Sequence, residues 1–270
     1  MVVELRPAFG QGGIEKSSHA GALARVEGAK DPDVHHLEEA NGGAPSLGPM
    51  GTPRTPKGRA KVVAARLADE YPEAICELDH HTPFELLVAT ILSAQTTDAR
   101  VNMVTPALFA RYPDAGSLAA ADPEELEDIV RSTGFYQSKA RNLISMAQSL
   151  MDRFDGEVPT AREDLVTLAG VGRKTANVVR SVAFDLPGLP VDTHVGRLAR
   201  RLGLTAAEDP VKVEAELGAM LPPAAWGDFS LRVILHGRRV CDAKRPRCAA
   251  CVLENVCPSS LLPRQRERAT

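Results

Sequence analysis

The chain has little net charge, no long apolar run and few cysteines. Its 270 residues include 32 basic and 35 acidic side chains, for a formal net charge of −3. Any binding to nucleic acid must therefore come from local clusters of charge and not from a positive field over the whole molecule. No apolar run is long enough to cross a bilayer, and residues 1–10 lack the apolar core of a signal peptide. We therefore expect a cytoplasmic protein with no membrane partner.

Alternating patterns typical of β-strands are also absent, whereas signals for helix starts recur. Each of these signals is a threonine or aspartate followed by proline, by a glutamate three residues later, or by both, and they lie at Thr82, Asp122, Thr160 and Asp209. Between them, alanine and leucine recur at helical spacing, for example over residues 139–154. The sequence predicts an all-α fold of roughly ten helices with short loops.

The two ends of the chain differ from this helical part. Over residues 41–58, nine of 18 residues are glycine or proline. A segment of that composition buries too little apolar surface to offset the entropy lost on ordering. We expect residues 1–58 to be a disordered N-terminal extension and residues 263–270 to be a flexible tail.

Four of the five cysteines fall within 17 residues, in a C-x6-C-x2-C-x5-C array formed by Cys241, Cys248, Cys251 and Cys257. In a reducing compartment such clustering favours a metal centre over disulfides. Four thiolates suit either zinc or an iron–sulfur cluster. The six-residue gap after Cys241 departs from the usual zinc pairs and favours the cluster, with zinc as the open alternative. Basic side chains in that gap, among them Arg245, can contact a phosphate backbone.

Residues 165–176 predict two helices joined by a tight turn containing Gly170, Val171 and Gly172. Glycines permit a positive φ and let another backbone come close. The amides at the start of the second helix form a seat for phosphate, which would hold DNA without reading its bases. The alternative is an ordinary corner between two helices.

Lys174 lies in the first turn of the second helix, where the helix dipole disfavours an ammonium ion. A neutral amine there can attack a carbon atom and form a Schiff base. The alternative is a lysine that binds phosphate. Asp192 follows 18 residues later, at a predicted helix start. It fits an N-cap, and its carboxylate could also take a proton from Lys174 or stabilise an oxocarbenium-like sugar.

The hairpin with its lysine, the V-D-T-H motif of residues 191–194 and the cysteine array, in this order, resemble endonuclease III. This is the bacterial DNA glycosylase and AP lyase of the helix-hairpin-helix superfamily. Residues 91–98, 133–140 and 234–238 also resemble segments of that family. The resemblance covers about residues 59–262.

The resemblance implies two helical domains with a DNA-binding cleft between them. Residues 76–186 would form a six-helix domain that contains the hairpin. Residues 59–75 plus 187–262 would form a discontinuous domain whose C-terminal loop carries a 4Fe–4S cluster on the four cysteines.

The resemblance also implies roles for individual residues. Lys174 would be the Schiff-base nucleophile and Asp192 the catalytic carboxylate. Gln95 would enter the gap left by a flipped nucleotide, and Phe135 stands where the family often has an aliphatic wedge. Ala169 replaces the usual proline before the turn, which should soften the turn without removing its amides.

The activity implied is the removal of oxidised pyrimidines from duplex DNA, followed by β-elimination at the abasic site. The partner would be double-stranded DNA with an oxidised pyrimidine or an abasic site, bound by a monomer at the bacterial nucleoid. One alternative is a MutY-type adenine glycosylase, but those enzymes typically lack the lysine and carry a glutamate in the helix matching residues 89–92. Another is a DNA-binding module without enzymatic activity, which would leave Lys174 and Asp192 together unexplained.

Overall fold

The computed structural model describes residues 53–263. Residues 1–52 and 264–270, which hold most of the predicted extension and of the predicted tail, lie outside the described residues. Within the described part every regular element is a helix and there is no strand, so the all-α class is confirmed. None of the helices in this part is both long enough and apolar enough to cross a membrane.

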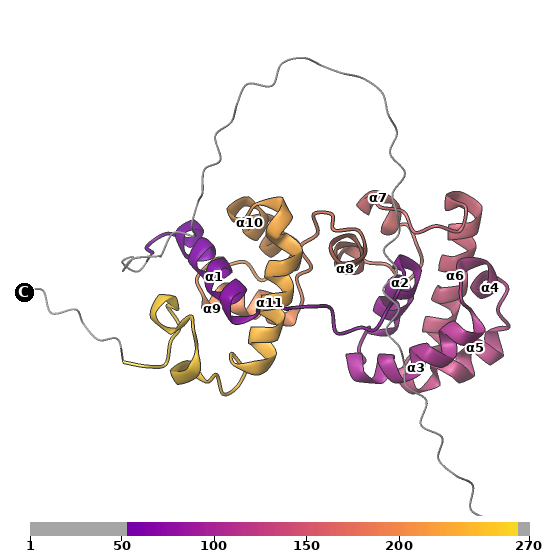
Figure 1. The fold of residues 1–270 in the computed structure, drawn as a ribbon, viewed down its shortest axis with the longest axis horizontal. Coiled ribbons are helices and arrows are strands. Elements are labelled where there is room, and N and C mark those ends of the chain that lie inside the picture. The colour runs from indigo at the N-terminus through magenta and orange to yellow at the C-terminus, as the bar shows by residue number, and fades with distance from the viewer. Residues whose placement is uncertain (1–52, 264–270) are drawn as a thin grey trace, which may run out of the picture. The chain divides into compact units, whose positions relative to one another are not determined.

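The helices follow one another with short connections (Figure 1). The α-helices are α1 Pro56–Glu70, α2 Pro83–Leu92, α3 Asp98–Arg111, α4 Ala115–Ala119, α5 Pro123–Val130, α6 Tyr136–Phe154, α7 Arg162–Leu165, α8 Arg173–Ala183, α9 Thr193–Arg201, α10 Pro210–Met220 and α11 Trp226–Arg239. Four 3-10 turns complete the set: η1 Arg131–Thr133, η2 Pro223–Ala225, η3 Cys248–Ala250 and η4 Glu254–Val256.

Four helices, α2, α5, α9 and α10, start where the sequence predicted, at a side chain that caps the first amides. Thr82 Oγ1 accepts a hydrogen bond from the Glu85 amide at 3.1 Å, and Asp209 Oδ1 accepts one from the Lys212 amide at 2.9 Å. Asp122 caps α5 in the same way. Helix α1 begins at Pro56, so its first three residues fall within the predicted extension 1–58.

The predicted cap at Thr160 is wrong. Helix α7 begins at Arg162 after Ala161, and no side chain caps it. The carbonyl of Thr160 instead accepts a hydrogen bond from the Arg180 side chain. The carbonyl that accepts the first helical hydrogen bond, from the Leu165 amide at 3.1 Å, is that of Ala161, so Ala161 and not Thr160 is the N-cap residue.

Two hydrophobic cores lie within the described residues. The first is built by one continuous stretch of chain, from Leu78 to Val179, in which α6 packs against α4 and α5 and α2 packs against α8. The second combines α1 with α9, α10 and α11, so that Val63 and Leu67 share a core with Val233. Helix α1 therefore packs with helices that follow it in the sequence by more than a hundred residues (Figure 1).

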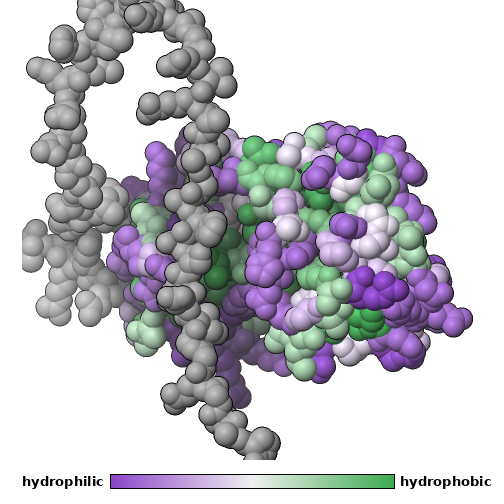
Figure 2. All heavy atoms as spheres, turned by 45° about the vertical axis from the view of Figure 1, so that its right-hand side comes forward, coloured by the Kyte–Doolittle hydropathy of each residue, from purple (hydrophilic) through white to green (hydrophobic). Residues whose placement is uncertain are grey.

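Ion pairs join the two cores at two places. Arg173 of α8 makes a bidentate ion pair with Glu214 of α10, at 2.7 and 3.0 Å, and the Glu214 side chain is buried. Arg238 of α11 donates to Asp98 Oδ2, at the start of α3, at 2.9 Å. The outer face shown in Figure 2 mixes hydrophilic residues with small hydrophobic patches, as expected when the large apolar side chains lie in the cores.

Candidate active site

The predicted hairpin is present between α7 and α8. Gly170 has a φ of +78°, which favours glycine, and a Cβ there would lie 3.1 Å from Asn142 Cβ and 3.3 Å from Ile91 Cγ2. Gly172 has an ordinary φ of −92° and is the N-cap residue of α8. A Cβ on Gly172 would meet nothing within 4 Å. Gly170 therefore gives the turn its shape, and Gly172 leaves open space at the start of α8.

The start of α8 offers unpaired amides to that open space. The first amides of an α-helix have no partner within the helix, and no side chain caps α8. Val171 is buried and ties the turn to the first core, together with Leu165 and Leu168. A rigid helix start with uncapped amides is suited to binding an anion such as phosphate.

Lys174 and Asp192 line the same pocket, although they come from different helices. The pocket has a volume of about 90 Å³, and its walls come from both cores. A second pocket, of about 500 Å³, is also lined by both residues. Lys174 is exposed in the first turn of α8. Asp192 caps α9, with Oδ1 accepting from the Val195 amide at 2.8 Å, so the predicted N-cap is confirmed.

The loop before Asp192 is fixed against α8. Asn177, one turn after Lys174, is buried and donates from Nδ2 to the carbonyl of Leu189 at 3.1 Å. Gly188 lies so close that a Cβ there would be 2.3 Å from the Asn177 carbonyl oxygen. This contact brings the start of α9 to Lys174, and nothing in the local sequence pattern announces it.

The pocket also contains charged residues that sequence reasoning missed. Arg238 lines it and bridges two acidic side chains, Asp98 and Glu77. Arg238 belongs to a segment that resembles endonuclease III, but its partners lie about 140 and 160 residues away in the sequence. Only the tertiary fold brings these charges together, so spacing could not have identified them.

Gln95 and Phe135, the predicted wedge residues, share an unusual backbone. Both are left-handed, with φ of +56° and +49°, although neither is a glycine. Both side chains are exposed, and that of Phe135 is 67% accessible. Gln95 follows α2 and Phe135 precedes α6, so each stands at the tip of a loop. An exposed aromatic side chain on a strained loop is a frequent sign of a functional position.

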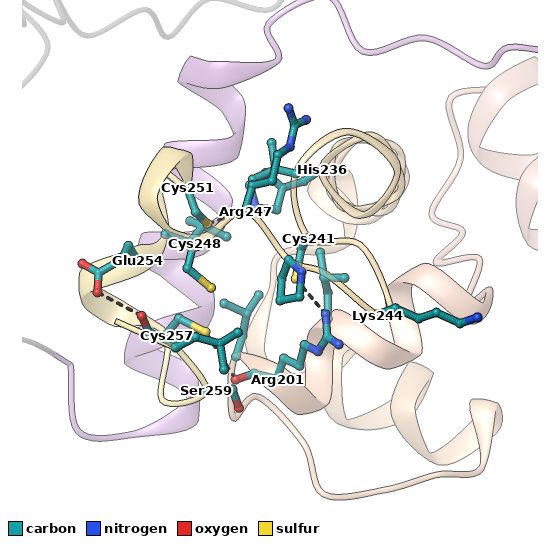
Figure 3. A pocket seen from close by; sticks show the side chains of 17 residues that line it. Arg201, His236, Cys241, Lys244, Arg247, Cys248, Cys251, Glu254, Cys257 and Ser259 are labelled. Carbon is teal, nitrogen blue, oxygen red and sulfur yellow. Dashed lines mark hydrogen bonds between the residues drawn. The ribbon is translucent and has the colours of Figure 1, made fainter. Parts of the chain in front are cut away.

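The four clustered cysteines line one cavity of about 350 Å³ (Figure 3). The regular elements of their segment are the short turns η3 and η4. Arginine side chains from other helices form hydrogen bonds with backbone carbonyls of this segment. Arg201 donates to the Asp242 carbonyl at 2.7 Å and to Cys241 Sγ at 3.3 Å. Arg66 of α1 donates to the Val252 carbonyl at 3.0 Å.

The thiols in this cavity are partly buried. Burial raises the pKa of Cys251 to about 11 and also raises the pKa of Cys257. His236 lies beside them, with Nε2 3.3 Å from Cys251 Sγ and Nδ1 3.0 Å from the Tyr71 hydroxyl. Four buried, neutral thiols gain no stability from lying together. Four thiolates that bind one positively charged metal centre do.

The four cysteines are a donor set that fits an iron–sulfur cluster. Among residues 53–263, no group of three or more histidine, cysteine and acidic side chains is placed to hold a single metal ion. In an iron–sulfur cluster each cysteine binds a different iron, so the sulfurs surround a void and do not meet at one point. The donor set of four cysteines around one cavity fits that requirement.

Arg245 lies on the exposed loop between Cys241 and Cys248. Asp242 Oδ1 accepts from the amides of Lys244 and Arg245, at 2.8 and 3.0 Å, and so fixes this turn. In Figure 3 the Lys244 side chain points away from the cysteines. The loop thus carries exposed basic side chains at the edge of the cavity, and two of them, Lys244 and Arg247, also contribute to its lining.

The fold is all-helical, and a glycine turn joins α7 to α8. Together with Lys174 in the first turn of α8 and Asp192 in the same pocket, this defines a helix-hairpin-helix protein. Residues 88–223 match the HhH-GPD family, described as "HhH-GPD superfamily base excision DNA repair protein". Endonuclease III of Synechocystis is 53% identical over 205 residues, which are 76% of this chain and 94% of that protein. Endonuclease III of Escherichia coli is 37% identical over 201 residues, 74% of this chain and 95% of that protein.

Solved structures agree with these relatives. A non-covalent endonuclease III–DNA complex is 44% identical, with a TM-score of 0.72, and the match covers 75% of this chain and 95% of that one. A trapped endonuclease III–DNA covalent intermediate is 45% identical, also with a TM-score of 0.72, over 75% and 96%. The chain belongs to the endonuclease III family of base excision DNA repair proteins. The family predicted from the sequence is confirmed, and these matches favour it over the adenine glycosylase alternative.

Proposed function

We propose that this protein excises oxidised pyrimidines from duplex DNA and cleaves the strand at the resulting abasic site, with Lys174 as the nucleophile. The observation that carries the assignment is that Lys174 and Asp192 line the same two pockets beside the hairpin. The related structures with DNA, one of them a covalent intermediate, support both a DNA substrate and a covalent step. Because the proposed substrate is DNA, we also assign the protein to the nucleoid, in the cytoplasm.

DNA would bind across the pocket between the two cores, which we assign to the domains 76–186 and 59–75 plus 187–262. The uncapped start of α8, with Gly170, Val171 and Gly172, would hold a phosphate. The basic loop around Arg245 would hold another. A base stacked in a duplex is out of reach of Lys174, so the damaged nucleotide must turn out of the helix, at a cost of about a few kcal/mol. Gln95 and Phe135 would fill the gap it leaves.

The chemistry begins with the neutral amine of Lys174. Nζ attacks C1′ of the extruded nucleotide, and the glycosidic C1′–N bond breaks as the base leaves with the bonding electrons and takes up a proton. Nζ loses one of its two protons, the C1′–O4′ bond opens as O4′ takes up a proton, and a protonated Schiff base remains between Nζ and C1′. The iminium then acidifies the C2′ proton. Loss of that proton expels the 3′ phosphate, which breaks the strand on the 3′ side of the lesion.

Asp192 would assist at two points. Its carboxylate would accept the proton from the Lys174 ammonium, so that the amine is free to attack, and would stabilise positive charge on the sugar as the base leaves. The Val195 amide occupies Oδ1 at 2.8 Å and orients the carboxylate toward the pocket that both residues line.

Cys241, Cys248, Cys251 and Cys257 would hold a 4Fe–4S cluster, as the chemistry of the donor set supports. When bound, the cluster would supply four iron–thiolate bonds that tie η3 and η4 to α11. The steps at Lys174 need no electron transfer. Arg201 and Arg66 hold the carbonyls of this loop, so the protein itself orients the cysteines toward one cavity.

Borohydride trapping tests the proposal. The protein is mixed with a duplex that contains one oxidised pyrimidine, and borohydride reduces any Schiff base to a stable covalent adduct. We expect an adduct with the wild-type protein and none with Lys174→Gln, while both proteins bind the duplex. Base release is followed in parallel on the same duplex.

The possible results separate three cases. Base release without an adduct would indicate a glycosylase that uses water as the nucleophile, and Lys174 would need another role. An adduct with Lys174→Gln would move the Schiff base to a different amine. The absence of both adduct and base release, on abasic DNA as well, would overturn the proposed function.

A further inference from the structure

Lys139 is a buried cation without a function in the steps above. It lies in the first turn of α6 and is only 5% exposed. Its amine donates to the Leu92 carbonyl at 2.8 Å, the Thr96 hydroxyl at 2.9 Å and the Thr133 carbonyl at 2.7 Å. All three acceptors are uncharged, and burial lowers the pKa of the amine. A buried charge at a helix start, where the dipole disfavours a cation, needs a reason.

The three acceptors come from two separate parts of the chain. Leu92 is the last residue of α2, and Thr133 is the last residue of η1. Carbonyls at helix ends have no partner within the helix and attract cations, so one ammonium serves both ends. The Thr96 hydroxyl also donates to the Thr133 carbonyl, which closes a small network between the two segments.

These two segments are the bases of the loops that carry Gln95 and Phe135. Thr96 is the neighbour of Gln95, and Thr133 is two residues from Phe135. Both loop tips have left-handed backbones, which are unfavourable for residues other than glycine. Such conformations persist only where the surroundings fix them. The Lys139 network supplies that fixation from beneath, on the side away from solvent.

We propose that Lys139 is a positioning residue that holds the two loops at a fixed separation, so that Gln95 and Phe135 enter the duplex together. The proposal rests on the proposed function, because it assigns these two side chains to the DNA. Lys139 itself touches no substrate. Its effect is therefore limited to steps in which a base must leave the stack and the gap must be filled.

Lys139→Met tests this, because methionine fills a similar space and donates no hydrogen bond. Two substrates are compared: an oxidised pyrimidine paired in a duplex, and an abasic site opposite a one-nucleotide gap. The second has neither a base to extrude nor an opposite base to hold. We expect Lys139→Met to lose about 100-fold on the paired lesion, as for a misplaced positioning group, and to change little on the gapped substrate.

Two controls separate positioning from general damage. Lys61 is an exposed lysine of α1, a helix that packs in the second core. Lys61→Met makes the same chemical change there and should leave both activities unchanged. Thr96→Val removes one acceptor and keeps the side-chain shape, so it should show the same selective loss at about tenfold. It also serves as the test if Lys139→Met proves unstable by circular dichroism and thermal unfolding.

A double-mutant cycle identifies the route of the effect. If Lys139 acts through the two loop tips, then Lys139→Met causes no further loss in a Gln95→Ala, Phe135→Ala background. Additive losses, or an equal loss on both substrates by a folded variant, would overturn the proposal. If the wild-type protein cleaves neither substrate, the proposed function fails and this proposal fails with it.

Discussion

The pocket at Lys174 and the cavity of the four cysteines hold their functional residues in different ways. In the pocket, both residues stand at the starts of helices, and the turn that follows each of them places a fully buried residue in a core: Ala176 in α8 and Val195 in α9 are 0% exposed. In the cavity, Cys248 stands on the turn η3, and the other three cysteines stand on irregular chain around η3 and η4. Arginine side chains from other helices support that chain through its carbonyls.

This difference indicates what each region needs in order to keep its shape. Hydrophobic cores fix a helix start without help from a ligand, so the pocket should be preformed. A loop with few regular hydrogen bonds gains much of its stability from the group it binds. The pocket should therefore tolerate loss of the cluster better than the cysteine loop does.

The largest effect expected is on activity, at Asp192. Asn is as good an N-cap as Asp, so Asp192→Asn should retain the bond to the Val195 amide and change stability by less than about 0.5 kcal/mol. It removes the carboxylate charge from the pocket that Lys174 also lines, and we expect base excision to fall by about 10²–10⁴-fold. Single-turnover excision assays on a paired lesion measure this loss.

Asp192→Ala is the matched variant, since it removes the cap as well as the charge. It should lose the same activity and, in addition, about 1 kcal/mol of stability in denaturant unfolding. Near wild-type excision by Asp192→Asn would leave Asp192 as a cap alone and remove it from the chemistry of the pocket.

The next effect concerns the cysteine loop and probes the contrast directly. Cys251→Ser should abolish cluster binding and lower the stability of the second core by more than about 3 kcal/mol. Iron content and visible absorption measure the cluster. A wild-type protein that is colourless and contains zinc would contradict the assignment of a cluster. Hydrogen exchange should show lost protection over residues 241–257 and retained protection over residues 165–176.

Cys76→Ser is the control for this substitution. Cys76 is the cysteine outside the array and lines the Lys174 pocket, where burial raises the pKa of its thiol. The same chemical change there should leave iron content and absorption unchanged. Equal loss of protection in the hairpin and in the cysteine loop of Cys251→Ser would mean that the two regions are not independent.

The same contrast explains what the sequence predicted. Local signals were sufficient for the helical class, for caps such as Thr82 and Asp192, and for the start of α8 at Arg173. Thr160 has the same local signal and is not a cap: its carbonyl accepts from the Arg180 side chain, and that of Ala161 accepts the first helical hydrogen bond of α7. Local patterns determine helix starts only where tertiary contacts do not compete for the same groups.

Contacts between distant segments could not be predicted. The amine of Lys139 meets Leu92, 47 residues earlier, and Arg238 meets Asp98, 140 residues earlier. Each contact depends on how helices pack, and neither residue type nor spacing specifies it. The left-handed backbones of Gln95 and Phe135 were missed for the same reason, since their surroundings impose them.

The smallest effects expected come from substitutions at the two glycines of the hairpin. They separate the contribution of each glycine to the shape of the turn from its contribution to DNA binding. Gly170→Ala places a Cβ at a positive φ and 3.1 Å from Asn142 Cβ, so it should cost about 1–2 kcal/mol of stability. Gly172→Ala places a Cβ in open space at an ordinary φ, and stability should stay within about 0.5 kcal/mol of the wild type.

DNA binding should reverse that order. The Cβ of Gly172→Ala stands in front of the uncapped amides of α8, where a phosphate would approach, so affinity for abasic duplex should fall about tenfold, or about 1.4 kcal/mol. Thermal unfolding and binding titrations at one fixed salt concentration measure the two effects side by side. If Gly172→Ala binds as tightly as the wild type, the start of α8 does not hold a phosphate, and the hairpin only positions Lys174.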